Sequence, residues 1–309
     1  MMSASYQYLF GPVPSRRLGR SLGIDVTPFE TCSFNCLFCQ CGSTTDRMTE
    51  RKEFVPFDAV CAEIARWLAE DGAADGITFA GSGEPTLYSR LGDLMGFIKS
   101  KTAIPVILLS NGTLLHRSDV RTEAAQADIV KISLSAWDEP SFQEINRPAP
   151  GLSLEQLLEG EKAFRKEFCG ELWLEVFLMK GINASTEQVR QIAAAAAGIH
   201  PDKIQLNTAV RPPAEAGIQS VAEEELESLC DLFTPRAEII ASFAAAKPGP
   251  GRELDTETLV ELIRRHPATA AQLAAVAGVR AAEIAAALAP LVATEKLQTE
   301  ERSGEIYYK

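Results

Sequence analysis

Short apolar runs alternate with amphipathic stretches along most of the chain. The runs with the length and composition of buried strands are Ser21–Thr27, Gly76–Ala80, Pro105–Ser110, Ile129–Leu134, Leu172–Leu178 and Lys203–Thr208, with Glu238–Phe243 as a seventh candidate. Between them, apolar residues recur at helical spacing, as in Leu154–Phe168, Thr186–Ile199 and Val221–Phe233. Alternation of this kind predicts βαβ units around a parallel sheet. About six such units favour an α/β fold of the partial (β/α)6 TIM-like barrel type.

The character of the sequence changes after residue 246. Residues 247–251 read Lys-Pro-Gly-Pro-Gly, a composition typical of a linker. The segment beyond it contains three helical patterns and then two strand-like runs around a turn: Asp255–His266, Thr269–Ala277, Ala281–Thr294, Lys296–Thr299 and Glu305–Tyr308. Helices followed by a hairpin predict a winged helix. We therefore expect a barrel domain at residues 1–246, a linker at 247–251 and a small C-terminal winged-helix domain at 252–309.

The composition is that of a folded, acidic protein. The chain has 309 residues, of which 46% are hydrophobic, and a formal net charge of −12. No apolar run has the length of a membrane span, and Met1–Phe10 lacks the blocks of a signal peptide, so we expect a soluble, cytoplasmic protein with no membrane partner. Thiols stay reduced in that compartment. We therefore expect Cys61, Cys169 and Cys230, which fall in helical patterns, to pack in the core.

Three cysteines follow the first predicted strand in one short loop. Cys32, Cys36 and Cys39 form a C-x3-C-x2-C run. Three thiolates at this spacing can bind three irons of a cubane cluster and leave the fourth iron without a protein ligand, where chemistry can take place. Two other interpretations stay open, because Cys41 could complete a zinc site or a four-cysteine cluster that only carries electrons.

Polar residues also follow the other predicted strands, at the point where each strand ends. They are Glu84, Asn111, Ser133, Ser135 and Asn207. The carboxyl ends of parallel strands meet on one rim of a barrel, so these side chains should surround the cysteine loop. Gly81 and Gly83, on either side of Ser82, would allow a ligand to approach the main chain beside Glu84 closely. Simpler interpretations are that Glu84 caps the next helix, that Asn111 belongs only to a turn, and that the two serines fill strand ends.

These motifs resemble those of radical S-adenosylmethionine (radical SAM) enzymes. The resemblance is carried by the cysteine loop together with the Gly-Ser-Gly-Glu run at residues 81–84, and it covers roughly residues 10–240. Within that superfamily the chain is similar to the group related to wyosine tRNA synthetases. The runs that carry this similarity are Gly11–Gly23, Ser110–Gly112, Ile145–Pro148, Leu172–Glu175 and Arg211–Pro213. The resemblance implies an enzyme, an oxidoreductase or a transferase, built on a radical SAM barrel.

The resemblance also implies cofactors and a role for each residue. Cys32, Cys36 and Cys39 would bind a [4Fe–4S] cluster, and its open iron would bind the amino and carboxylate groups of SAM. Glu84 would hold the SAM ammonium group by a charge-assisted hydrogen bond. The other SAM contacts would come from Phe38 at the adenine, from Ser133 and Ser135 at the ribose or carboxylate, and from Gly81, Gly83, Asn111 and Asn207.

A one-electron donor such as flavodoxin or ferredoxin would start the reaction that the resemblance implies. Reductive cleavage of SAM would yield methionine and a 5′-deoxyadenosyl radical, which abstracts hydrogen from an unidentified substrate. Wyosine tRNA synthetases have further N-terminal cysteines for a second cluster, whereas this chain has none before Cys32. The net charge of −12 also weighs against a nucleic-acid substrate. We therefore favour a protein, peptide or metabolite substrate, with tRNA base modification or a non-catalytic iron–sulfur electron carrier as alternatives.

The charges of the expected winged helix bear on its partner. Residues 252–309 hold seven Lys or Arg against nine Asp or Glu, and residues 281–294 hold no Lys or Arg. A helix that enters a DNA groove normally carries a basic stripe. The winged helix is therefore expected to dock a protein or a peptide rather than DNA.

Overall fold

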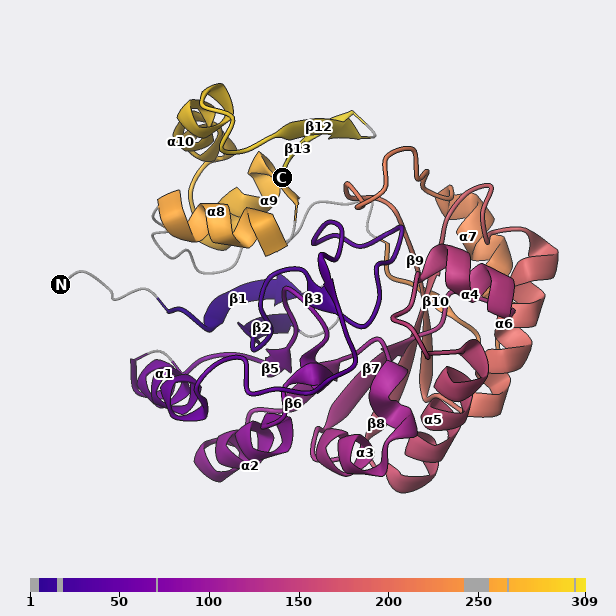
Figure 1. Cartoon of the computed structure of the whole chain (residues 1–309). Coiled ribbons are helices and arrows are strands. Elements are labelled where there is room, and N and C mark those ends of the chain that lie inside the picture. Colours follow the sequence, from indigo (N-terminus) through magenta and orange to yellow (C-terminus); the bar gives the residue numbers. More distant parts are fainter. Residues whose placement is uncertain (1–5, 16–18, 71, 242–255, 266, 303) are drawn as a thin grey trace.

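Eight strands form the central sheet of the structure, a computed structural model that describes residues 6–15, 19–70, 72–241, 256–265, 267–302 and 304–309 (Figure 1). The strands, in sheet order, are β1 (Leu9–Ser15), β2 (Gly19–Ile24), β5 (Gly76–Phe79), β6 (Val106–Leu109), β7 (Ile129–Ser133), β8 (Glu171–Leu178), β9 (Lys203–Thr208) and β10 (Glu238–Ile239). Neighbouring strands from β2 to β10 are parallel, whereas β1 is antiparallel to β2. The predicted linker at residues 247–251 lies outside the described residues.

Helices connect the parallel strands in the predicted alternation. They are α1 (Phe57–Glu70), α2 (Leu91–Lys101), α3 (Ser118–Ala124), α4 (Glu139–Ile145), α5 (Leu154–Glu167), α6 (Thr186–Ile199) and α7 (Glu223–Cys230). The loops also contain the 3-10 helices η1 (Pro85–Leu87) and η2 (Thr113–His116) and the short strands β3 (Thr31–Cys32) and β4 (Asp46–Arg47). The six predicted strands are confirmed, and the seventh candidate is present as the two-residue β10. The mixed α/β architecture with a large parallel sheet is therefore as expected.

The antiparallel strand β1 was not predicted. Its sequence includes Pro12 and Pro14, and prolines normally argue against a strand because they lack the N–H that a ladder needs. An edge strand tolerates them, and β1 is an edge of this sheet. The pairing with β2 is irregular between Phe10 and Val13, which is where Pro12 lies.

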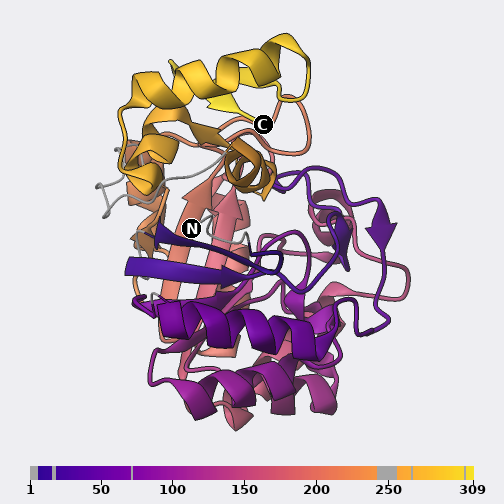
Figure 2. The same cartoon turned by 90° about the vertical axis from the view of Figure 1, so that its left-hand side faces the viewer.

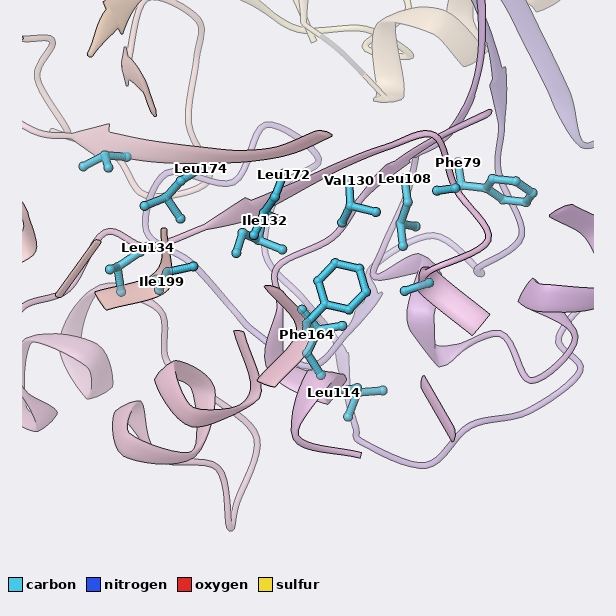
Figure 3. Packing of buried hydrophobic residues seen from close by; sticks show 14 of the residues in the cluster. Phe79, Leu108, Leu114, Val130, Ile132, Leu134, Phe164, Leu172, Leu174 and Ile199 are labelled. Carbon is cyan, nitrogen blue, oxygen red and sulfur yellow. The ribbon is translucent and has the colours of Figure 1, made fainter. Parts of the chain in front are cut away.

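The face of the sheet that meets the helices is apolar. Figure 3 shows Leu108 of β6, Val130 of β7 and Leu172 of β8 together with Phe164 of α5 and Ile199 of α6. All five side chains are almost fully buried and belong to one cluster. Burial of apolar area at about 25 cal/mol per Å² makes this layer the main source of stability, and it fixes where the ends of the strands lie.

The opposite face of the sheet carries several polar side chains. Ser21 of β2 and Thr78 of β5 share a hydrogen bond at 2.7 Å. Farther along the sheet, Lys131 of β7 forms an ion pair with Glu175 of β8, and Asn207 Nδ2 of β9 donates to Glu175 Oε1 at 2.8 Å. Successive strand residues point to opposite faces, so the inner face carries polar side chains while the outer face packs on helices.

The C-terminal unit, residues 256–309 as described, has its own small core. It consists of α8 (Thr256–Arg265), α9 (Ala270–Ala277), α10 (Ala281–Ala293) and the sheet β11 (Ala268–Thr269), β13 (Glu305–Tyr308), β12 (Thr299–Arg302). Leu259, Ile263, Leu273 and Leu288 are buried together at its centre. The three predicted helices are present. The strand expected at 296–299 instead begins at Thr299, and β11 was not predicted.

The remaining cysteines divide into two kinds. Cys61 on α1 and Cys230 on α7 are buried, as expected. The prediction for Cys169 is wrong: it lies just beyond the end of α5, in the turn before β8, and is exposed. Among the described residues, none of the helices has the length and apolar character required to cross a membrane.

One carboxyl group is buried in the helical layer. Glu161 on α5 is fully buried, and neither of its side-chain oxygens has a hydrogen-bond partner among the described residues. Burial raises the pKa of this carboxyl well above its ordinary value of 4.5. The folded protein therefore holds a proton at Glu161 that the unfolded chain releases once the pH exceeds that value.

Replacing Glu161 with glutamine is expected to flatten the dependence of stability on pH. Because the folded state binds the extra proton, the free energy of unfolding of the wild type should fall as pH rises above 4.5. The free energy of unfolding of the wild type should fall more steeply with pH than that of Glu161→Gln, and the two slopes should differ by at most about 1.4 kcal/mol per pH unit. Urea unfolding from mildly acidic to mildly alkaline pH measures it. Glu159→Gln, an exposed change on the same helix, should keep the wild-type slope, and an equal slope in Glu161→Gln would contradict the burial argument.

Candidate functional site

The cysteine loop lies between β2 and α1 and is fastened to the segment that follows α4. β3 and β4 pair with each other and close the loop on itself. The cysteine loop is bonded to the end of α4, because Asn35 N donates to Asn146 O and Leu37 N donates to Ile145 O, each at 3.0 Å. The main chain on both sides of Cys36 is therefore held in place by a segment about 110 residues away.

The three thiols of the C-x3-C-x2-C run lie near one another in one half-buried site. Burial raises the pKa of Cys32 to about 12, and the charge of Glu84 adds to the effect. Burial also raises the pKa of Cys36 well above its ordinary value, and the neighbouring charges of Cys39 and Cys32 contribute. A hydrogen bond from Cys41 lowers the pKa of Cys39 to about 7. The thiols are thus close enough to influence one another, and bound cationic metal would stabilise their thiolate forms.

Two side-chain amides from different loops donate to these sulfurs. Asn111 Nδ2 lies 3.5 Å from Cys32 Sγ, and Asn146 Nδ2 lies 3.5 Å from Cys36 Sγ. Hydrogen bonds to ligand sulfurs stabilise thiolate character and tune iron–sulfur clusters. Asn111 was among the predicted residues, whereas Asn146 was not. The signal that could have pointed to Asn146 was its place in the Ile145–Pro148 run.

The three thiols fit a cluster in which each binds a different iron, rather than a single metal ion that all three would share. In the described part of the chain, no group of three or more His, Cys, Asp or Glu is close enough to share a single metal ion. The fit therefore rests on three half-buried, neighbouring thiols with amide donors at two of them. Cys41 lies beside the triad, because its thiol is a hydrogen-bond partner of Cys39 and its Sγ lies 3.3 Å from Gly81 O.

The glycine loop between β5 and η1 is shaped by atoms of the chain itself. Gly81 has φ +146°, and a Cβ there would lie 2.3 Å from Asp25 Cγ. A Cβ on Gly83 would lie 1.8 Å from Thr31 O, beside Cys32. Both positions thus need glycine so that this loop can approach β2 and β3. The sequence had suggested room for a ligand instead.

Asp25 holds this loop from the end of β2, and no sequence signal singled it out. Its Oδ2 accepts a hydrogen bond from Ser82 Oγ at 2.6 Å, and both carboxylate oxygens lie 3.2 Å from Ser82 N. The Asp25 side chain is buried. The Asp25 carboxylate and the Cys41 thiol therefore fix Gly81 and Ser82 from two sides.

Glu84 joins the loops that follow β5 and β6. It is only 2% exposed. Its Oε1 accepts from Thr86 N at 3.0 Å and from Thr86 Oγ1 and Ser110 Oγ at 2.7 Å, and its Oε2 accepts from Asn111 N at 2.7 Å. Burial outweighs these hydrogen bonds and raises the pKa of the carboxyl. Glu84 thus caps η1 and also connects the loops after β5 and β6, next to Cys32.

Asn111 connects the rim to the cysteine loop. Besides its contact with Cys32, Nδ2 donates to Ser33 Oγ at 2.9 Å. Its Oδ1 accepts from Thr113 N at 3.0 Å and from Thr113 Oγ1 at 2.7 Å. The side chain therefore has a fixed orientation, and Asn111 is more than a turn residue.

The other predicted residues lie on the same rim with different surroundings. Phe38 stacks on Phe177 at 4.3 Å between ring centroids, at the end of β8. Ser133 ends β7, opposite Glu175 in register. Ser135 is buried and its Oγ accepts from Phe177 N at 3.1 Å, so it fixes β8. Asn207 points to Glu175 on the inner face. The structure thus brings Asn111 and Glu84 to the cysteines, and it leaves Ser135 and Asn207 in contact with the chain itself.

Comparisons with known proteins agree with this geometry. The family model described as Radical SAM superfamily matches residues 26–193. A UPF0026 protein of Methanocaldococcus jannaschii is 35% identical over 226 residues, which are 72% of this chain and 70% of that relative. A protein named GTPase Obg from Brachyspira hyodysenteriae is 36% identical over 303 residues, or 97% of this chain, which spans 45% of that relative's length.

A likeness to a solved structure supports the fold. The structure described as "Structure of TYW1 with a lysine-pyruvate adduct bound" has a TM-score of 0.52 and 19% sequence identity, and the match covers 71% of this chain and 74% of that chain. At this identity the likeness concerns the fold alone.

Proposed function

Because the chain belongs to the radical SAM superfamily and to the UPF0026 proteins, we propose that Cys32, Cys36 and Cys39 bind its [4Fe–4S] cluster and leave one iron for SAM. The family is one of enzymes that use this cluster and SAM. When bound, the two cofactors supply a one-electron reductive cleavage that yields a 5′-deoxyadenosyl radical. The observation that carries the proposal is that amides of Asn111 and Asn146 meet two of the three thiols.

The side chains around the thiols have separate tasks in this proposal. Asn111 and Asn146 orient the thiolates and stabilise their charge. Glu84 keeps the loops after β5 and β6 together and places a negative charge beside the SAM ammonium group. Phe38 and Phe177 offer an aromatic surface for the adenine, and Ser133 a hydroxyl for the ribose or carboxylate. Gly81 and Gly83 let the glycine loop approach β2 and β3, which would bring the main chain of that loop beside the SAM site.

The experiment that tests this function measures SAM cleavage. Protein purified without air is reconstituted with iron and sulfide, reduced with dithionite and mixed with SAM. We expect 5′-deoxyadenosine and methionine as products. A sample that holds a full cluster and still forms no 5′-deoxyadenosine would overturn the proposal.

We favour a protein, a peptide or a metabolite as the substrate. The C-terminal unit has the helix and hairpin order of a winged helix, and α10 carries no Lys or Arg, which supports docking of a protein or peptide rather than DNA. A relationship to wyosine tRNA synthetases, with tRNA as substrate, is the alternative. Sequencing both the RNA and the protein that co-purify with the chain separates the two. The electron would come from a donor such as flavodoxin or ferredoxin.

Replacing Cys41 with alanine is expected to leave the cluster intact. An electron carrier without SAM chemistry would need a fourth thiolate, and Cys41 is the nearby candidate. In the proposal the triad suffices, and Cys41 is its neighbour: the Cys41 thiol hydrogen-bonds to Cys39, and its Sγ lies 3.3 Å from Gly81 O. We expect Cys41→Ala to keep the wild-type iron content and a change in the electron paramagnetic resonance signal on addition of SAM. Loss of iron from Cys41→Ala would favour the electron carrier. So would an electron paramagnetic resonance signal of the wild-type cluster that does not change when SAM is added.

A further inference from the structure

The C-terminal unit contacts the barrel through Arg302 of β12. Its Nη1 donates to Ala209 O and its Nη2 donates to Ile218 O, each at 2.9 Å. Its Nε donates to Glu300 Oε1 at 2.8 Å, and Lys309 Nζ donates to Glu300 Oε2 at 2.6 Å. Only 16% of the Arg302 side chain is exposed. A guanidinium held by three acceptors in this way has a fixed position.

Ala209 and Ile218 belong to the loop between β9 and α7, residues 209–222, which we call the β9–α7 loop. This loop lies against the cysteine loop. Glu215 N donates to Leu37 O at 3.0 Å, and Leu37 directly follows the second cysteine of the triad. Ala209, Ile218 and Leu37 also pack in one apolar cluster. An unbroken series of contacts therefore leads from β12 to the main chain that carries the thiols.

The placement of the C-terminal unit agrees with these contacts. Figure 1 shows it above β1 and β2, and α9 contacts β1. In Figure 2 the strands β8 and β9 point toward it. The side of the sheet where the parallel strands end, and where the cysteine loop lies, is thus the side that the C-terminal unit faces.

We propose that Arg302 is a positioning residue for SAM binding, because it holds the β9–α7 loop closed over the cysteine loop. The inference rests on the proposed cluster and SAM site. With both carbonyls bound to one guanidinium, the ends of the loop segment 209–218 cannot separate. Arg147 adds a more exposed ion pair to Glu215 at 2.9 Å. A closed loop keeps water away from a reactive radical, as lids do in other enzymes.

Hydrogen exchange measures the closed state without cofactors. The peptide covering residues 209–222 is followed by mass spectrometry in the full chain. Arg302→Ala removes both donors, so exchange in this peptide should become about tenfold faster or more. Arg302→Lys keeps the charge but cannot span both carbonyls, and an intermediate rate is expected. Arg280→Ala is the matched control, since Arg280 is 82% exposed and pairs with Glu283 in the same unit, and its rate should be that of the wild type.

Kinetics of the reconstituted enzyme measure the effect on SAM. If the β9–α7 loop of Arg302→Ala is closed only about a tenth of the time, the KM of this variant for SAM should be about tenfold above that of the wild type. Its kcat should differ from that of the wild type by less than about twofold. Loss of folded enzyme alone would lower kcat and leave the KM unchanged. If Arg302→Ala does not fold, Glu300→Gln, which weakens the support of the guanidinium and the contact with Lys309 but leaves both carbonyl contacts of Arg302, should give the same changes at a smaller size.

The outcomes separate the inference from the proposed function. Faster exchange with a raised KM supports the positioning role. Unchanged exchange in Arg302→Ala, equal acceleration in Arg280→Ala, or a wild-type KM for SAM would overturn it. Absence of SAM cleavage by the wild type would instead refute the proposed function, whatever the exchange rates are.

Discussion

Replacing Cys36 with alanine is expected to abolish iron binding and SAM cleavage together. Cys36 is the central residue of the triad, and its sulfur accepts a hydrogen bond from Asn146. With two thiolates left, a cubane has two unprotected irons and is not retained. Iron and sulfide content per chain, the visible absorption of the reconstituted protein and the yield of 5′-deoxyadenosine should all fall to background.

Cys169→Ala provides the matched control for this loss. Cys169 is exposed and lies outside the cysteine loop, so its removal should leave iron content and 5′-deoxyadenosine yield at wild-type levels. Wild-type iron and SAM cleavage in Cys36→Ala, or equal losses in both variants, would show that the triad has been assigned wrongly.

Changes at Glu84 are expected to separate its structural role from its electrostatic role. Glu84→Ala would leave the Ser110 hydroxyl, the Asn111 N–H and the Thr86 donors without their acceptor in a buried site. At about 1–3 kcal/mol for each unsatisfied group, the free energy of unfolding should fall by at least about 3 kcal/mol. Asn111 would also lose the orientation that brings it to Cys32, so iron content should fall as well.

Glu84→Gln keeps the shape of the side chain and removes the charge. It should retain most of the iron, whereas the dissociation constant of SAM should rise about 10–100-fold, since a charge-assisted hydrogen bond contributes about 1.5–3 kcal/mol. Urea unfolding and SAM titration of the reconstituted protein measure the two effects. Glu159→Gln, an exposed glutamate on α5, should alter neither. Wild-type SAM affinity in Glu84→Gln would mean that Glu84 acts only as a cap and connector.

Much of the fold could be predicted from the sequence because secondary structure leaves a local pattern. A buried strand requires a short, mostly apolar run, and a helix that packs on such strands requires apolar residues every three or four positions. The run Lys203–Thr208 and the helix Thr186–Ile199 were predicted to the residue. β1 was not predicted because its prolines are unusual in a strand, and only its place at the edge of the sheet makes them acceptable.

The candidate site could be predicted in part for the same reason. Cys32, Cys36 and Cys39 lie within eight residues, so their spacing alone indicates a shared metal site. Strand ends of a parallel sheet meet on one rim, which brought Glu84 and Asn111 into the prediction. The glycines beside Glu84 were recognised as special, but the atoms that require them could not be named from the sequence.

The partners of those residues came only from the tertiary structure. Asn146 meets Cys36 across 110 residues, Asp25 meets Ser82 across 57, and Arg302 meets Ala209 across 93. Local periodicity reports whether a side chain is buried, and it contains no record of which distant loop will cover it. That choice follows from the order of the strands and from how the loops above them pack, so the cysteine triad could be read from the chain while the contacts that orient it could not.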